Sequence, residues 1–207
     1  DPDATERLAQ VVRPFLLRRR KSDPDIAPEL PPKTERDVVV PLTAEQITLY
    51  EAMVRETLDK IARTTGIERR GLVLKLITNH PAQFLRQRGP LPGRSGKLDA
   101  LDELLDVIVA EGDAGLVFTQ YVQMGKLLVA HLAERGISHG FLHGRVPVAA
   151  REDLVDQFQA GALDVLVLSL KAGGTGLNLT RATHVVHFDR WWNPAVEDQA
   201  TDRTYRI

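Results

Sequence analysis

Hydrophobic positions follow a helical spacing from residue 43 to residue 61. Apolar side chains recur there at three- and four-residue steps, so that they form one stripe on a helix of about twenty residues. Thr43 and Gln46 have the spacing of a capping box, in which each side chain accepts a hydrogen bond from the backbone N–H of the other residue. We expect a helix that begins at this box and packs through the stripe formed by Ile47, Tyr50, Val54, Leu58 and Ile61.

The residues on either side of this helix set the bounds of a helical unit. Proline recurs throughout residues 1–41, which prevents a long helix there and predicts a connector. A second apolar helical stretch at 72–77 ends near Pro81, and a run rich in glycine, proline and arginine follows at 89–96. We therefore expect residues 42–96 to form a helical insertion.

From residue 97 onward, helical stretches alternate with short apolar runs that predict strands. Strands separated by helices imply right-handed crossover connections and a parallel sheet that is covered on both faces. The expected fold of residues 97–207 is therefore α/β, with helices flanking a parallel sheet. The predicted strands lie at 115–121, 138–143, 164–170 and 184–189.

Composition narrows the class of protein. Of the 207 residues, 43% are hydrophobic and 27% are charged, which fits a soluble globular protein with one core and a smaller appendage. The sequence contains no membrane-spanning apolar run and does not begin with a signal-peptide pattern. It contains no cysteine, which excludes disulfides, thiolate catalysis and zinc–thiolate sites. A cytoplasmic location is expected, with association with the nucleoid if the protein is bacterial.

The net charge of -1 conceals a local excess of basic residues. The stretch 66–96 holds six Lys or Arg residues and one acidic residue. Judged by charge composition alone, it is the part of the chain that best fits a surface for contact with phosphate. A solvated helix face is the alternative interpretation, and charge alone favours it.

The loops that follow the predicted strands are where a ligand is expected, because parallel α/β sheets bind ligands at the carboxyl ends of their strands. The loop at 171–180 contains three glycines, which let backbone amides approach a bound group closely. By itself this pattern is more typical of a tight turn. It lacks the Gly-Lys-Ser/Thr ending of a P-loop, and no P-loop occurs anywhere in the chain.

Several short segments, in the same order along the chain, resemble the C-terminal motor lobe of Swi/Snf-type helicase-like ATPases. This lobe is RecA-like, the family belongs to helicase superfamily two, and the resemblance is to a bacterial member. These segments span nearly the whole chain, and their order and spacing are similar to those of the family. They are Pro14–Arg19 with Lys21–Asp23, Glu29–Lys33, Asn79–Pro81, Ser95–Leu98, Val117–Tyr121, Leu142–Gly144, Leu168–Leu179, Asp189–Pro194 and Asp198–Ile207.

The resemblance implies a motor of two lobes, with ATP and Mg²⁺ in the cleft between them and double-stranded DNA across both. Residues 1–41 would be the interlobe connector, 42–96 the helical insertion or protrusion, and 97–207 the second lobe, whose last motif would continue past Ile207. The P-loop and the magnesium-binding carboxylates would belong to the first lobe, the partner of this one. The full-length protein would be a DNA-dependent ATPase, and this chain alone would be monomeric, free of cofactor and inactive.

The resemblance also assigns roles to individual residues. Arg203 and Arg206 would be arginine fingers, although the residues alone favour an intrahelical ion pair. Gly174, Gly176, Asn178 and Gln199 would shape the edge that faces ATP. The DNA backbone would contact Lys171, Trp192, Thr119, Gln120, His143, Gly144 and Arg145.

Some alternatives remain open at this stage. Arg145 either contacts a phosphate or points into solvent, and Trp191 is expected to be the buried neighbour of Trp192. No metal site is expected, because His139 and His143 do not converge at a spacing of four on a strand. The alternative function is a stand-alone module that binds nucleic acid or protein and has lost its catalytic partner lobe. A P-loop upstream of this sequence would decide between the two functions.

Overall fold

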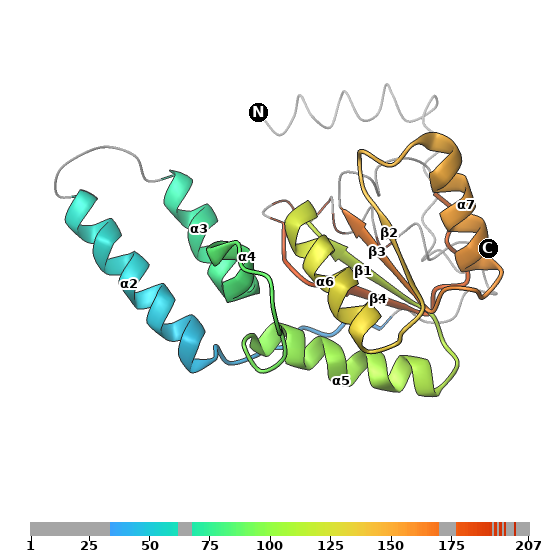
Figure 1. Cartoon of the computed structure of the whole chain (residues 1–207), viewed down its shortest axis with the longest axis horizontal. Helices are drawn as coiled ribbons and strands as arrows, with labels where there is room; N and C mark the ends of the chain where they lie inside the picture. Colours follow the sequence, from blue (N-terminus) through green and yellow to red (C-terminus); the bar gives the residue numbers. More distant parts are fainter. Residues whose placement is uncertain are drawn as a thin grey trace, which may run out of the picture. The chain divides into compact units, whose positions relative to one another are not determined.

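The fold is described from a computed structural model of the chain. It covers residues 34–61, 68–169, 177–191, 193, 195, 197 and 201. The chain divides into two compact units, residues 1–36 and 37–207, and every element described below lies in the second unit (Figure 1). No helix within the described ranges is both long enough and apolar enough to cross a membrane.

Four strands in the described residues form one parallel sheet in the order β2-β3-β1-β4. Their bounds are Gly115–Thr119 for β1, His139–Leu142 for β2, Val165–Ser169 for β3 and His184–His187 for β4. Thr119 pairs with Ser169, and Phe118 with His187, so the carboxyl ends of the strands lie at one edge of the sheet. The predicted parallel α/β sheet is confirmed, and each strand lies within the apolar run that predicted it.

Helices cover both faces of this sheet, as Figure 1 shows. One face packs against α5 (Gly96–Ala110) and α6 (Val122–Glu134), through a cluster that includes Leu105, Leu128, Val117 and Val167. The other face packs against α7 (Val148–Gln159), through a cluster that includes Phe158, Leu116, Phe118 and Leu166. Because both faces are covered, β1 and β3 are buried at every position, which explains why they read as unbroken apolar runs.

In the described residues before α5 there are three helices: α2 (Ala44–Ile61), α3 (Glu68–Asn79) and α4 (Pro81–Leu85). The capping box predicted at the start of α2 is present. The Thr43 N–H donates to Gln46 Oε1 over 3.0 Å, and the Gln46 N–H donates to Thr43 Oγ1 over 3.3 Å. Helix α2 therefore begins where the sequence predicts.

The apolar stripe predicted for α2 is only in part its packed face, since Tyr50 and Val54 are half-buried. Ile47 is 45% exposed and Leu58 is 61% exposed, whereas the polar Gln46 is fully buried. The side-chain amide of Gln46 donates to the carbonyl oxygens of Ile77, at 3.0 Å, and Thr78, at 3.1 Å, near the end of α3. These directional bonds fix the rotation of α2 against α3, which places Ile47 on the outside.

The two ends of this helical region meet. The Thr43 hydroxyl donates to the carbonyl oxygen of Arg94 over 3.0 Å. A Cβ atom at Gly96 would collide with the carbonyl oxygen of Pro41, so this approach requires glycine. The chain therefore enters and leaves the helical region at nearly the same point.

Candidate functional site

Asp189 joins two loops at the carboxyl edge of the sheet. It lies two residues beyond β4, and it is only 3% exposed. Its carboxylate accepts a hydrogen bond from Thr119 Oγ1 over 2.5 Å and another from the Gln120 N–H over 2.9 Å. Because β1 and β4 are neighbours in the sheet, one carboxylate holds both the loop that follows β1 and the segment that follows β4.

A third group reaches Asp189 from the helical region. Asn79, the last residue of α3, donates from Nδ2 to the Asp189 carboxylate over 3.3 Å. The ammonium group of Lys97 donates to Asn79 Oδ1 over 2.9 Å and lies 5.9 Å from the centre of the Phe188 ring. We call Asn79, Lys97, Thr119 and Asp189 the Asp189 cluster. It links α3 and α5 to the ligand edge of the sheet.

Burial dominates the electrostatics of the Asp189 cluster. It raises the pKa of Asp189, and the hydrogen bonds from Thr119 and Gln120 and the charge of Lys97 oppose this shift. Burial likewise lowers the pKa of Lys97, while the charge of Asp189 raises it and that of Lys75 lowers it. Burial thus disfavours the charged form of each group, and hydrogen bonds to Asp189 and the attraction between the two charges offset this cost in part.

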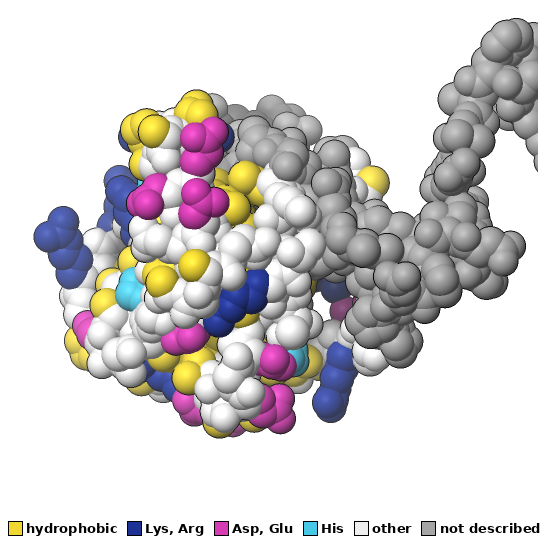
Figure 2. All heavy atoms as spheres, turned by 90° about the vertical axis from the view of Figure 1, so that its right-hand side faces the viewer, with side chains coloured by type: hydrophobic (Ala, Val, Ile, Leu, Met, Phe, Trp, Pro, Cys, Tyr) yellow, Lys and Arg dark blue, Asp and Glu magenta, His cyan; other side chains and the backbone are white. Residues whose placement is uncertain are grey.

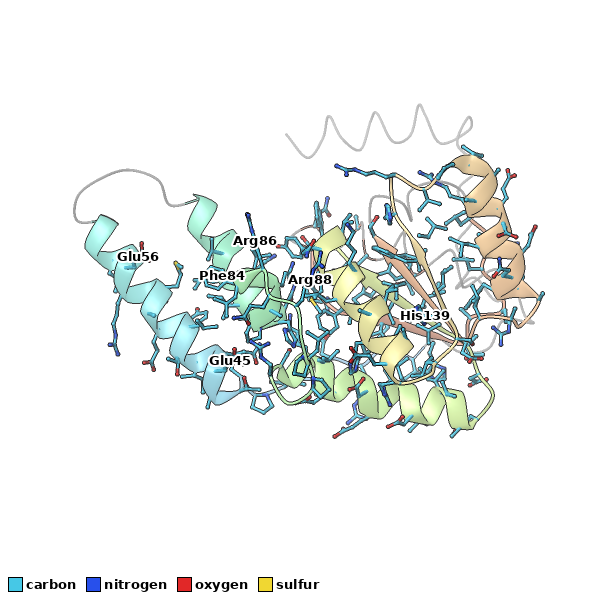
Figure 3. The ribbon with its side chains drawn as sticks, in the orientation of Figure 1. Glu45, Glu56, Phe84, Arg86, Arg88 and His139 are labelled. Carbon is cyan, nitrogen blue, oxygen red and sulfur yellow. The ribbon has the colours of Figure 1, made fainter. Side chains whose placement is uncertain are left out.

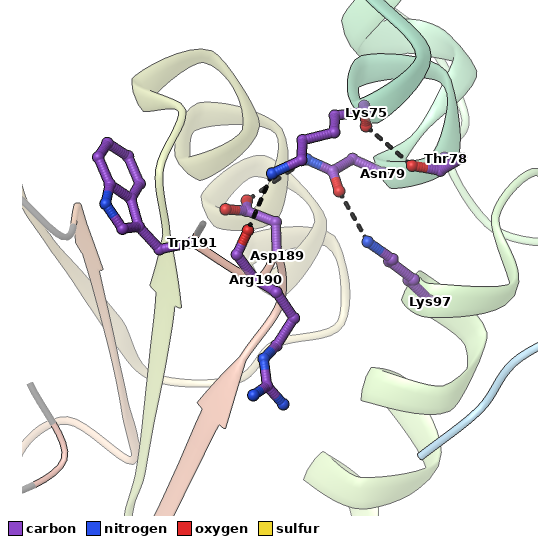
Figure 4. Close-up of a pocket in the computed structure, with 7 residues that line it drawn as sticks. All are labelled: Lys75, Thr78, Asn79, Lys97, Asp189, Arg190 and Trp191. Atoms are coloured by element: carbon purple, nitrogen blue, oxygen red, sulfur yellow. Dashed lines mark hydrogen bonds between the residues drawn. The ribbon is translucent and has the colours of Figure 1, made fainter. Parts of the chain in front are cut away.

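An open hollow of about 260 Å³ lies beside this cluster (Figure 4). The ammonium group of Lys75, on α3, donates to the carbonyl oxygen of Arg190 over 3.2 Å. The Gln120 side chain donates to the same oxygen over 2.6 Å. The hollow is lined by Lys75, Thr78, Asn79, Lys97, Asp189, Arg190 and Trp191.

The guanidinium group of Arg190 points away from the other lining side chains in Figure 4. It forms ion pairs with Asp37, over 2.7 Å, and with the buried Glu197, over 2.9 Å. Its charge is therefore neutralised outside the hollow.

The structure separates the roles of Thr119 and Gln120, which the sequence assigned together to DNA. Thr119 is fully buried and its hydroxyl is bound to Asp189, so its side chain has no surface to offer a ligand. Gln120 is partly exposed. Thr119 thus positions this loop, and Gln120 is the residue of the pair that can reach a ligand.

The loop after β2 lies apart from the Asp189 cluster, because β3 and β1 separate β2 from β4. His143 is half-buried, with its ring centre 4.7 Å from that of Phe141, and Gly144 and Arg145 are exposed. The Arg145 N–H donates to His143 Nδ1 over 3.2 Å. This loop and the Asp189 cluster are therefore two separate points along the same edge.

Several predicted site residues lie outside the described residues. Asn178 is described and is exposed, just before the buried Leu179. Trp191 is half-buried and packs against the cluster beneath α7. The predicted residues beyond the described ranges are Lys171, Gly174, Gly176, Trp192, Gln199, Arg203 and Arg206.

Sequence reasoning gave no role to Asn79, Lys97 or Asp189, although all three lie in segments that resemble the family. One signal could have revealed them. Asp189 is a charged residue directly after an apolar strand, at the edge where ligands bind. The partners of such a residue cannot be found from local spacing, because Asn79 lies 110 positions away in the sequence.

Histidines and basic residues in the described part of the chain are dispersed. His139 begins β2 (Figure 3), whereas His143 follows the other end of that strand. Within the described ranges, no three His, Asp or Glu side chains form a group that could hold a metal ion.

On the face that Figure 2 shows, Lys and Arg side chains are interspersed with Asp and Glu. A phosphate-binding surface on that face would therefore be local.

Two family models match the chain. The model described as "Helicase conserved C-terminal domain" matches residues 96–207, and the model described as "SNF2-related domain" matches residues 1–85.

Curated relatives are similar over nearly the whole chain. The putative ATP-dependent helicase/translocase YwqA of Bacillus subtilis is 49% identical over 97% of this chain and 23% of its own length. The mouse SWI/SNF-related matrix-associated actin-dependent regulator of chromatin subfamily A member 1 is 34% identical over 100% of this chain and 21% of its own length. The chain thus spans about a quarter or less of these relatives.

Solved structures show the same likeness. The SWI2/SNF2 ATPase core of Sulfolobus solfataricus in complex with double-stranded DNA is 40% identical, with a TM-score of 0.75 over 98% of this chain and 44% of that chain. The C-terminal domain of the Sulfolobus solfataricus SWI2/SNF2 ATPase is also 40% identical, with a TM-score of 0.69 over 78% of this chain and 74% of that domain.

Proposed function

The chain belongs to the SWI2/SNF2 family of ATPases, whose C-terminal domain it matches, and we propose that it is the second motor lobe of an ATP-dependent translocase on double-stranded DNA. In the proposed division, residues 1–41 connect the lobes, 42–96 form the insertion and 97–207 form the RecA-like lobe. The partner lobe would carry the P-loop and the magnesium-binding carboxylates. The chain alone would then be a monomer that does not hydrolyse ATP.

The observation that carries this proposal is the Asp189 cluster. A buried carboxylate holds the loop after β1 and the segment after β4 at the edge where parallel α/β sheets bind their ligands. A motor lobe requires such fixed loops, because small errors in the position of catalytic groups reduce the rate strongly. That the Sulfolobus relative was solved with double-stranded DNA supports duplex DNA as the track.

We propose that this lobe contacts the DNA backbone and not the base edges. Gln120 would donate from the loop after β1, and His143, Gly144 and Arg145 from the loop after β2. Lys171 and Trp192 would add a charge and an apolar face, and Thr119 would act through Asp189. Such contacts favour binding without sequence preference and with strong dependence on salt.

For ATP, we propose that Arg203 and Arg206 are arginine fingers that stabilise the charge that develops on the transferred phosphoryl group. Gly174, Gly176, Asn178 and Gln199 would shape the surface that faces the nucleotide. ATP and Mg²⁺ would be held mainly by the first lobe, which is why this chain alone is expected to be inactive.

The arginine-finger proposal can be tested in a protein that contains both lobes. Arg203→Ala or Arg206→Ala should lower DNA-stimulated ATP hydrolysis by about 10³-fold, while ATP affinity changes by less than about tenfold, because most nucleotide contacts lie on the other lobe. Arg→Lys should recover little of the rate, because an ammonium group lacks the planar fork that binds two phosphate oxygens.

Arg55→Ala is a matched control, because Arg55 is an exposed arginine whose described partner is the neighbouring Glu51 on the same helix. Its turnover should stay near that of the wild type. Near wild-type turnover in an Arg203 or Arg206 variant would return that residue to a surface role. If the two-lobe protein showed no DNA-stimulated hydrolysis at all, the proposed function itself would be wrong.

A further inference from the structure

The hollow beside Asp189 contains one cation whose charge no described carboxylate balances. Among the described residues, the Lys75 ammonium group donates to the Arg190 carbonyl oxygen alone, and no carboxylate lies at ion-pair distance from it. An ammonium group has three N–H donors, so donors remain for another acceptor. Arg190 is neutralised by Asp37 and Glu197, and the charge of Lys97 acts on Asp189.

The hollow thus favours an anion. Lys75 and Lys97 both line the hollow, so two like charges lie along it, and the charge of Lys75 contributes to lowering the pKa of Lys97. A negative group between them would relieve this repulsion. Asp189 does not fill this place, because its carboxylate is buried and already accepts from Thr119, Gln120 and Asn79.

The size of the hollow limits what the anion can be. At about 260 Å³ and open to solvent, it is smaller than the sites of roughly 300–1,000 Å³ that enclose a drug-sized ligand. It therefore suits one anionic group of a larger ligand that extends into solvent, rather than a ligand enclosed as a whole.

The surroundings favour a group that belongs to a nucleic-acid backbone. Lys75 and Gln120 donate to the same carbonyl oxygen, that of Arg190, so Lys75 lies next to the loop proposed to face DNA. Figure 3 shows Arg86 and Arg88 on the loop that follows α4, and both are exposed. The helical region therefore carries further exposed positive charge.

We propose that this hollow binds one phosphate of the backbone of double-stranded DNA, with Lys75 as the principal donor and Lys97 as supporting charge. The helical region is then part of the DNA contact and not only a structural appendage. This inference rests on the proposed function, since it assumes that the lobe lies on duplex DNA.

The test is the salt dependence of binding of the 207-residue chain to a short DNA duplex. Each neutralised phosphate contributes about -0.9 to the slope of log affinity against log salt. Lys75→Gln should therefore make the slope shallower by about 0.9 and weaken binding several-fold at low salt. Lys75→Arg keeps the charge and should retain the wild-type slope. Glutamine has nearly the helix propensity of lysine, so α3 should be preserved, which circular dichroism checks.

Lys126→Gln is the matched control, because Lys126 is an exposed lysine on α6, outside the hollow. Its slope should equal that of the wild type. An unchanged slope in Lys75→Gln would overturn the phosphate site and leave the proposed function intact. If the wild type itself bound duplex DNA without salt dependence, the proposed function would fail. A loss seen on single-stranded RNA, but not on duplex DNA, would overturn duplex DNA as the ligand.

Discussion

The sheet region and the helical region differ in how much of their packing depends on buried polar side chains. In the sheet region, Val, Leu and Phe side chains of β1 and β3 pack against three helices in two apolar clusters. In the helical region, Gln46, Asn79, His80 and Ser95 are buried, and each makes a hydrogen bond to a defined partner. Apolar burial is non-directional, whereas a buried polar side chain is stable only in the orientation that satisfies it.

Removal of a large side chain from an apolar cluster should produce the largest effect. Phe118 is fully buried in the cluster beneath α7. Phe118→Ala should lower the free energy of unfolding by about 3–5 kcal/mol, because it removes apolar contact and leaves a cavity. Denaturation in urea measures this loss. Val107→Ala is the control, since Val107 is 51% exposed, and it should change stability by about 0.5 kcal/mol or less. Equal losses in the two variants would contradict this account of the sheet core.

In the helical region, loss of hydrogen bonds should matter more than loss of apolar surface. Gln46→Leu keeps a side chain of similar size but leaves the carbonyl oxygens of Ile77 and Thr78 without their donor. It should cost about 1–3 kcal/mol of unfolding free energy, the usual penalty for a buried group left unpaired. Ile47→Ala, at the exposed neighbouring position, should cost less. A stabilised Gln46→Leu variant would show that apolar packing governs this region as well.

This contrast explains what could be predicted from the sequence. The strands were predictable because burial on both faces leaves an unbroken apolar run, as in β3. The capping box of α2 was predictable because its two partners lie three residues apart. The burial of Gln46 was not predictable, because its side-chain amide is turned inward by carbonyl groups about thirty positions away, which no local period encodes.

The candidate site follows the same rule. The loops that follow the strands were predictable because the alternation of helices and strands determines where a parallel sheet binds ligands. The Asp189 cluster was not predictable, because its members come from α3, α5, β1 and the segment after β4. The predictions for the arginine fingers and the glycine loop remain predictions.

The smallest expected effect is a dependence of stability on pH through His80. Its Nε2–H donates to the Leu91 carbonyl oxygen over 3.0 Å, and its Nδ1 accepts from the Ala82 N–H over 3.0 Å, so the neutral ring satisfies both partners. Burial lowers the pKa of His80 below its ordinary value of 6.5, and the charge of Arg94 lowers it further, while the bond to Leu91 and the charge of Glu45 raise it. The neutral ring is therefore the form that the fold favours.

Since the folded state disfavours the proton, the stability that His80 contributes is present above pH 6.5 and is lost as the pH falls below that value. The urea concentration at the midpoint of denaturation should thus decrease as the pH is lowered from about 7.5 to about 5.5. This window lies above the range of Glu45, whose pKa is lowered by its hydrogen bonds with Arg94. His80→Asn should be less stable at the higher pH, but less sensitive to acid. Identical pH profiles for the two proteins would assign the effect to another group.

Pro41 and Gly96 are in contact, so the two ends of the helical region lie at one point of the fold. Because the two ends of the segment touch, the length of the chain between them can change without moving the start of α5. Since loop-closure entropy grows only slowly with length, a longer segment could occupy the same place at little extra cost. The junction thus tolerates insertions between Pro41 and Gly96, provided that Asn79 still reaches Asp189 and that Ala82 and Leu91 still pack in the core.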